Sequence, residues 1–164
     1  MQVVPFTQDF AEGVVSVILR IQQSEFAIPI TLEAQPDLLD IPGFYQCGDG
    51  NFWVAVDDRT VVGTLALLDI GNHQAALRKM FVASSYRGAD HGVARMLLQT
   101  LLGWCSARGI RDVFLGTTTE FLAAHRFYEK NGFRELSREA LPADFPVMAV
   151  DTRFYGLSLW RDDA

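Results

Sequence analysis

The chain has 164 residues, a net charge of −6, 49% hydrophobic residues and 21% charged residues. This length suits one domain that buries about two-thirds of the surface of its unfolded chain, and no stretch reaches the roughly 18 consecutive apolar residues of a membrane span. The acidic balance argues against general nucleic-acid binding, because contacts to phosphate backbones require clustered Lys and Arg. We therefore expect one soluble domain, residues 1–164, that binds neither nucleic acid nor membrane.

The first residues lack the basic start and the long apolar stretch of a secretory signal, which predicts a cytoplasmic protein. Cys47 and Cys105 are the two cysteines, and neither belongs to a CxxC motif or has a histidine nearby. This pattern predicts free thiols, no disulfide and no metal site.

An N-terminal helix is the first predicted element. Asp9 and Glu12 have the spacing of a capping box, and apolar residues then recur at helical spacing through Gln22. Residues 24–50 contain three prolines and several glycines. They predict a long irregular connection with one short helix, of the kind that often lines a substrate site.

The rest of the chain predicts strands and helices in alternation. Residues 52–56 and 61–69 read as a β-hairpin around the turn 57–59, and residues 75–82 read as a third strand. Further along, the patterns predict a helix over 92–107, a strand over 110–115, a helix over 121–130 closed by Asn131-Gly132, and one or two final strands within 147–159. The predicted fold is α+β with three layers, in which a mostly antiparallel mixed sheet is flanked by helices.

The segment Leu77–Ala94 joins a strand to a helix through a loop that contains glycines. Such a loop directs backbone N–H groups between Gly88 and Ala94, and the positive end of the helix dipole, toward one point. It can therefore hold a phosphate group without a metal, so the expected ligand is a phosphorylated cofactor. The loop alone could also be an ordinary strand-to-helix turn. Four basic residues add a local cationic spot around it: Arg78, Lys79, Arg87 and Arg95.

Two motifs together carry a family resemblance. Phe81-Val82 followed by Tyr86-Arg-Gly-Ala-Asp-His-Gly92, and Ala123-Ala-His-Arg-Phe-Tyr-Glu-Lys-Asn-Gly-Phe133 about 35 residues later, resemble the acyl-CoA-binding motif and the tyrosine-containing motif of the GNAT N-acetyltransferases. The resemblance covers about residues 52–133. It implies a GNAT-like fold and transfer of an acetyl group from acetyl-CoA to an amine of a small molecule or a peptide.

The resemblance also implies which residues meet the cofactor. The end of the strand would pair with the pantetheine arm and direct an N–H group at the thioester oxygen, while the loop would hold the pyrophosphate. The implied cofactor-binding residues are Met80, Phe81, Val82, Arg87, Gly88, Ala89, Asp90, His91, Gly92, Val93, Ala94 and Thr118.

The chain departs from the family pattern at two positions. Asp90 stands where an ungapped match expects glycine, and a gapped match instead uses Gly92-Val93-Ala94 as the end of the loop. Phe121 stands seven residues before Tyr128, where many relatives carry Asn. A hydroxyl of the run 117–119, and Thr118 in particular, could supply the missing polar contact, although threonines also simply favour strands.

Tyr128 is the predicted catalytic residue. In the family this tyrosine lies near the sulfur, where its phenol can protonate the leaving thiolate. A proton acceptor for the amine is required too, and the sequence leaves it open among Glu25, Glu33, Asp69, His73 and Glu120. His91 is expected to be a loop donor and His125 an exposed helix residue.

Direct attack in a ternary complex is the expected mechanism, without an acyl-enzyme. One alternative is a catalytically weak acyl-CoA-binding sensor or partner module. A second is a mononucleotide or dinucleotide site, which the absence of GxxxxGK[ST] disfavours. The apolar segment Val150–Trp160 is interpreted as either a core strand or a homodimer contact.

Overall fold

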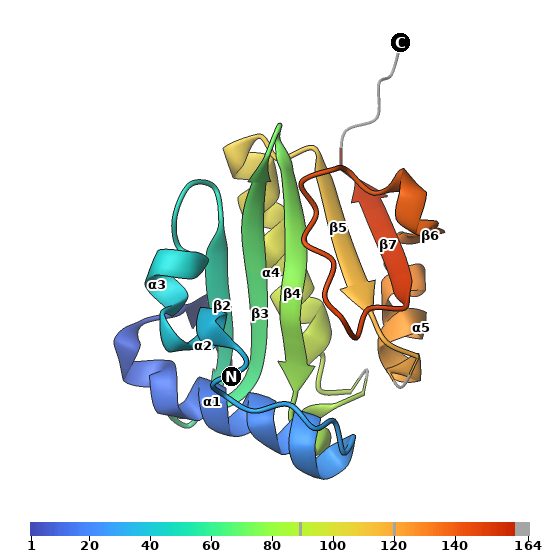
Figure 1. Cartoon of the computed structure of the whole chain (residues 1–164). Helices are drawn as coiled ribbons and strands as arrows, with labels where there is room; N and C mark the ends of the chain where they lie inside the picture. The colour runs from blue at the N-terminus through green and yellow to red at the C-terminus, as the bar shows by residue number, and fades with distance from the viewer. Residues whose placement is uncertain (89, 120, 160–164) are drawn as a thin grey trace.

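A seven-stranded mixed sheet forms the centre of the computed structural model, which describes residues 1–88, 90–119 and 121–159. The strand order is β1-β2-β3-β4-β5-β7-β6, and each neighbouring pair is antiparallel except β4 and β5 (Figure 1). The strands are β1 Gln2–Pro5, β2 Asn51–Asp57, β3 Thr60–Gly71, β4 Gln74–Val82, β5 Asp112–Thr117, β6 Arg134–Leu136 and β7 Arg153–Ser158. The predicted fold class is confirmed.

Helices cover both faces of the sheet. The first face carries α1 Ala11–Leu19, its π-helical continuation Arg20–Glu25, α2 Pro36–Leu39 and α3 Ile41–Phe44. The second face carries α4 Val93–Arg108 and α5 Leu122–Lys130. None of the helices within the described ranges is long and apolar enough to cross a membrane.

Side-chain alternation along β2 shows why this sheet has two apolar faces. Phe52 and Val54 pack into the core under α1, whereas Trp53 and Ala55 pack into the core under α4. Successive residues of a strand point to opposite faces, so a strand covered on both sides reads as a continuous apolar run.

The predicted hairpin is confirmed, and its turn has the expected chemistry. Asp58 and Arg59 have φ of 47° and 65°, the pair of positive values that a type I′ turn requires. The segment 150–160 contains β7, which lies between β5 and β6 and buries Phe154 and Tyr155, so residues 153–158 form a core strand. A homodimer stays a prediction.

The N-terminal helix begins differently from the prediction. Residues Gln8–Phe10 form a 3-10 turn, α1 starts at Ala11, and no side chain caps its first turn, so the predicted capping box is wrong. The connection that follows contains two four-residue helices, α2 and α3, rather than one.

Strands β4 and β5 separate after a short paired section. Three residue pairs join them, from Gln74↔Asp112 to Ala76↔Phe114. Beyond Ala76, β4 keeps its partner β3 and β5 keeps its partner β7, but no described residue of one strand pairs with the other. The sheet therefore opens into a wedge between residues 77–82 and residues 115–117.

A β-bulge interrupts β4 inside this wedge. The register with β3 shifts between the pairs Ala66↔Arg78 and Thr64↔Phe81. Lys79 has φ of 53°, and the hydroxyl of Thr64 donates to its carbonyl oxygen at 2.7 Å. A bulge breaks the strict alternation of side chains along a strand, which affects the cavity described next.

Candidate active site

A cavity of about 1040 Å³ occupies the wedge. Its walls come from the end of β4, the end of β5, one side of α5, the segment after α1, the loop before α4 and the segment 145–151 before β7. Most residues that the sequence predicted for the site line it: Met80, Phe81, Val82, Arg87, Gly88, Gly92, Ala94, Thr118 and Tyr128.

Three predicted residues lie elsewhere. Val93 is 1% exposed and packs in the core, because it begins the buried face of α4. Asp90 is exposed, and the ring of the exposed His91 lies 5.9 Å from that of Tyr86. None of these three side chains borders the cavity. Ala89 is outside the described residues.

The loop before α4 presents backbone rather than side chains. Gly88 has φ of 102°, and Gly92, the N-cap of α4, has φ of 65°. Such angles suit glycine. No side chain caps α4, so the N–H groups of its first turn keep their capacity to bind an anion.

Arg87 has two partners within the protein. Its Nε donates to the carbonyl oxygen of Val82 at 2.8 Å, and its guanidinium forms a bidentate pair with the carboxylate of Glu25. This contact lowers the pKa of Glu25, chiefly through the hydrogen bond from Arg87. Arg87 therefore ties the end of β4 to the end of the π-helix, and Glu25 balances its charge.

Tyr128 points its hydroxyl at β4. The side chain is 5% exposed, and the hydroxyl donates to Sδ of Met80 at 3.6 Å. Burial raises the pKa of Tyr128 far above its usual range, so the phenol is protonated at neutral pH. A thioether is a weak acceptor, and the phenol proton thus remains available to a stronger one.

Comparisons with known proteins agree with this geometry. Residues 17–133 match the profile of the "Acetyltransferase (GNAT) family". The chain belongs to this family. A GNAT acetyltransferase of known structure from Staphylococcus aureus Mu50 has a TM-score of 0.92 and 37% identity to this domain, with 97% of this chain and 99% of that one covered.

Two further relatives extend the comparison. N-acetylaspartate synthetase of Xenopus tropicalis is 38% identical over 104 residues, which are 61% of this chain and 37% of that protein, so the match spans little more than a third of that relative. The PaiA N-acetyltransferase of Thermoplasma acidophilum, solved with coenzyme A, has a TM-score of 0.71 and 16% identity over 96% of this chain and 98% of that one, and shows the shared fold.

The departure from the GNAT pattern at Phe121 has a structural counterpart. Its ring meets Phe26 edge-on at 4.8 Å between centroids and Phe81 at 6.4 Å. All three residues line the cavity. An apolar contact across the wedge thus replaces the polar one that the family pattern predicts at this position.

His125 supports the strand end where Thr118 lies, and the expectation that it is exposed is wrong. Its ring is 3% exposed, with Nε2 at 2.8 Å from the carbonyl oxygen of Thr118 and Nδ1 at 3.0 Å from Nη1 of Arg153. Because arginine can only donate, we assign Nδ1 as the acceptor and Nε2 as the donor. The apolar periodicity of α5 did not predict that His125 is buried.

None of the described proton acceptors that the sequence suggested borders the cavity. Glu25 pairs with Arg87, Glu33 is exposed, Asp69 accepts from the N–H groups of Asp49 and Gly71, and His73 lies in an exposed turn. Glu120 is outside the described residues. No group of three or more metal-binding side chains occurs in the described part of the chain either.

Asp151 is the one carboxylate among the described residues that line the cavity. One oxygen accepts from the backbone N–H of Met148 at 2.9 Å. Burial raises the pKa of this carboxyl above its usual value, against the smaller opposing effects of that hydrogen bond and of Arg78. Sequence reasoning missed Asp151 because it belongs to an irregular segment that only the fold brings to the end of β5.

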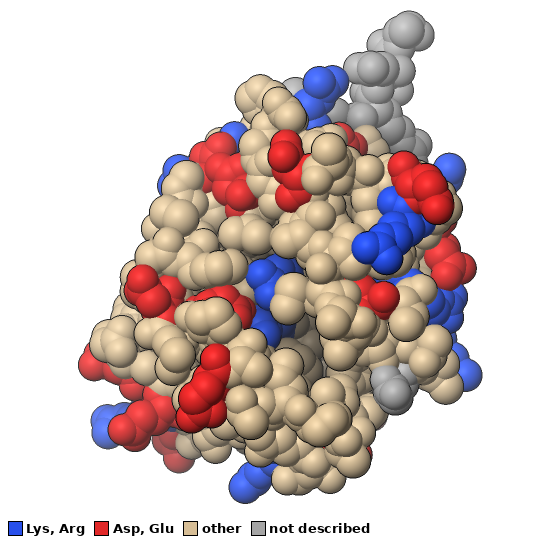
Figure 2. Space-filling view, viewed as in Figure 1, with Lys and Arg blue, Asp and Glu red and all other residues tan. Residues whose placement is uncertain are grey.

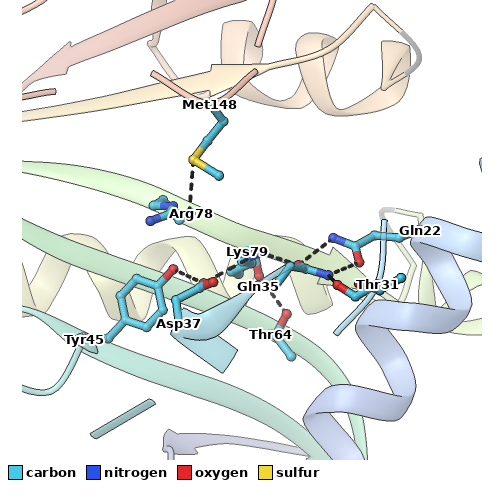
Figure 3. A network of polar contacts seen from close by, with 9 residues as sticks. All are labelled: Gln22, Thr31, Gln35, Asp37, Tyr45, Thr64, Arg78, Lys79 and Met148. Carbon is cyan, nitrogen blue, oxygen red and sulfur yellow. Dashed lines mark hydrogen bonds and ion pairs between the residues drawn. The ribbon is translucent and has the colours of Figure 1, made fainter. Parts of the chain in front are cut away.

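Arg78 and Lys79 enter the cavity side by side, away from the loop with which the sequence grouped them. Both line it, which the bulge in β4 explains. Figure 3 shows that Lys79 joins a buried polar network: its Nζ donates to Oε1 of Gln35 at 2.5 Å and lies 3.6 Å from the carboxylate of Asp37. Burial lowers the pKa of Lys79, although Asp37 opposes this shift.

Proposed function

We propose that this GNAT domain transfers an acetyl group from acetyl-CoA to an amine by direct attack in a ternary complex. The observation that carries the proposal is the separation of β4 from β5 after Ala76, which opens a cavity that ends at the uncapped N-terminus of α4. An anion fits at the helix end, and an extended amide chain fits along the unpaired edge of β4.

Different segments that line the cavity would bind different parts of acetyl-CoA. Backbone N–H groups between Gly88 and Ala94, apart from those of His91 and Gly92 that donate to the carbonyl oxygen of Gly88, would hold the pyrophosphate. The backbone of residues 80–82 would hold the pantetheine arm and the thioester oxygen. Acetyl-CoA supplies an activated acyl group whose leaving group is a thiolate. Tyr128, with its protonated hydroxyl beside β4, would donate the proton that this thiolate needs.

Asp151 would accept a proton from the incoming amine. Amines are mostly protonated near neutral pH and must lose a proton before they attack a thioester. Asp151 lines the cavity, and its raised pKa makes it a better proton acceptor than an ordinary aspartate.

The variant Asp151→Asn should lower kcat/KM by about 100-fold and remove the acidic limb of the pH–rate profile. Asp144→Asn, an exposed change in the same connection, should leave both unchanged.

Direct transfer is supported by the positions of the two cysteines. Cys105 is buried in α4, where burial raises the pKa of its thiol to about 12, and Cys47 is exposed beside α3. Neither lines the cavity. The double variant Cys47→Ala/Cys105→Ala should therefore retain most of its turnover, and complete loss in a folded variant would contradict direct attack.

The deciding experiment pairs calorimetry of CoA and acetyl-CoA binding with a CoA-release assay over amines, amino acids and short peptides. We expect binding of both cofactor forms and release of CoA with at least one class of acceptor. Absence of CoA binding at millimolar concentration would refute the proposal. Binding without release across the panel would instead favour an acyl-CoA sensor. A cytoplasmic location and a homodimer stay predictions.

A further inference from the structure

Arg78 lies at one end of the cavity, in contact with aromatic rings and a thioether. It lies on β4 two residues beyond the last pair with β5, and its guanidinium carbon is 5.6 Å from the ring centroid of Phe44 and 5.8 Å from that of Tyr45. One guanidinium nitrogen donates to Sδ of Met148 at 3.5 Å (Figure 3). Two aromatic rings and a thioether therefore surround a permanently charged group.

The positive charge of Arg78 forms no ion pair within the described part of the chain. No carboxylate in the described ranges lies within 4 Å of its guanidinium, whereas its neighbour Lys79 has Asp37 at 3.6 Å and Arg87 has Glu25. Asp151 lines the same cavity and interacts with Arg78 electrostatically, but from beyond ion-pair distance. A guanidinium has five N–H donors in a planar fork, and the single acceptor found here is a weak one.

Other basic side chains that border the cavity differ in exposure. Arg95, Arg126 and Lys130 lie on α4 and α5 and are exposed, so water satisfies them. Arg78 is partly buried, where an unpaired charge is costly and an anion is bound more strongly than at the surface. Figure 2 shows Lys and Arg atoms in the hollow over β4, with acidic side chains near its rim.

A buried network of hydrogen bonds holds Tyr45, one of the two rings that Arg78 contacts. The hydroxyl of Tyr45 donates to Asp37 at 2.6 Å, and Asp37 pairs with Lys79. Gln35 accepts from Lys79 and exchanges two hydrogen bonds with Gln22, at 3.0 and 2.9 Å. Within this network Asp37 offsets the charge of Lys79, so the positive charge that remains for a ligand is that of Arg78.

We propose that the acceptor is an amine that also carries a carboxylate, of the size of an amino acid, and that Arg78 binds this carboxylate. The inference rests on the acetyl transfer proposed above and specifies its substrate class. A guanidinium binds a carboxylate through two parallel hydrogen bonds. One cation and one anion in one cavity complement a molecule that carries both charges.

The test compares each acceptor with its carboxamide. The acceptors are alanine, leucine, phenylalanine and aspartate, each beside the analogue in which the α-carboxylate is an amide, and the enzymes are wild type, Arg78→Gln, Arg78→Lys and Arg134→Gln. Arg134 is an exposed residue of β6 outside the cavity and serves as the matched control. For at least one pair the wild type should prefer the acid about 10- to 100-fold in kcat/KM, the range expected for hydrogen bonds to a charged group.

Arg78→Gln should abolish this preference by slowing the acid and leaving the carboxamide within about threefold. Arg78→Lys should keep part of the preference because it keeps the charge without the fork. CoA affinity should be unchanged in all variants, and Arg134→Gln should behave as wild type. A wild type without any preference, or a preference that persists in Arg78→Gln, would overturn the inference.

Binding measurements separate this inference from the proposed transfer. Calorimetry in the presence of CoA, with the N-acetyl derivatives of the same four amino acids and their carboxamides, needs no turnover. Tighter binding of the acids that depends on Arg78 supports the carboxylate site even if no acetyl transfer is detected. Transfer to simple amines without discrimination by charge would refute the carboxylate site and leave the acetyltransferase proposal standing.

Discussion

The two ends of the cavity use arginine in opposite ways. At the loop end, Arg87 belongs to the motif that predicts cofactor binding, yet three of its N–H donors are directed at Glu25 and at the carbonyl oxygen of Val82. At the other end, Arg78 belongs to no motif, yet its charge has no carboxylate partner among the described residues. A motif thus predicts where a binding site lies, but the partners of each charged side chain decide whether that charge is available to a ligand.

The largest effect should come from the group between the two ends. Tyr128→Phe removes the phenol proton and should lower kcat about 100-fold, because a positioned acid contributes at least that factor. CoA affinity should change little, since the ring remains. Steady-state kinetics with calorimetry measures both quantities.

Tyr155→Phe is the matched control for this change. Tyr155 is also a buried tyrosine, but its hydroxyl donates to Glu129 and it does not line the cavity. Its kcat should stay near that of wild type. Equal losses of kcat in the two variants would assign Tyr128 to packing rather than to proton transfer.

The backbone conformation at the loop end should affect CoA affinity more than the charge of Arg87 does. Gly92→Val forces a branched side chain into a left-handed conformation at the start of α4, which should weaken CoA binding about tenfold or more by distorting the N–H groups there. Gly109→Val imposes similar strain at the other end of α4, where φ is 75°. Calorimetry should find normal CoA affinity in the folded Gly109 variant. Equal weakening in both would indicate a general loss of stability.

Releasing Arg87 from its ion pair with Glu25 should change CoA affinity less. Glu25→Gln removes the carboxylate that holds the guanidinium, and CoA affinity should then rise about threefold, the scale of a partly exposed ion pair. Calorimetry at low and high salt should show the gain shrinking as salt increases. Glu33→Gln, another exposed acidic change nearby, is the control. A lower affinity for Glu25→Gln would mean that this ion pair positions the loop.

Alkaline pH should reveal two buried tyrosines, Tyr45 beside Arg78 and Tyr128 between the two ends, without any effect near neutrality. Burial raises the pKa of Tyr45 and of Tyr128 above the usual 10.0. The folded state then keeps a proton that the unfolded state loses, so this stability is complete below that value and falls as the pH rises above it, by up to about 1.4 kcal/mol per pH unit for each tyrosine. Urea unfolding should show a shallower decline for Tyr45→Phe and Tyr128→Phe, whereas an unchanged slope would contradict the raised pKa.

Sequence patterns predicted the parts of this molecule that depend on residues close together in the sequence. The hairpin, α4, α5 and the glycines of the loop follow from alternation, periodicity and turn chemistry, and nine of the predicted site residues line the cavity. Asp151 and the pairing of Arg78 with Tyr45 escaped prediction because they join segments far apart in the sequence. His125 escaped because its burial depends on Arg153 and the end of β5.

The short contact between β4 and β5 has a mechanical consequence. In the described chain, three residue pairs and one backbone hydrogen bond beside them, from the N–H of Arg111 to the carbonyl oxygen of His73, join the half with β1–β4 to the half with β5–β7. Cohesion between the halves therefore also depends on the apolar core under α4, a cluster that contains Leu97 and Leu101 together with residues of β2–β5 and β7. Shortening either leucine should hasten amide exchange along β5 and loosen the wedge that contains the cavity, although neither side chain lines that cavity.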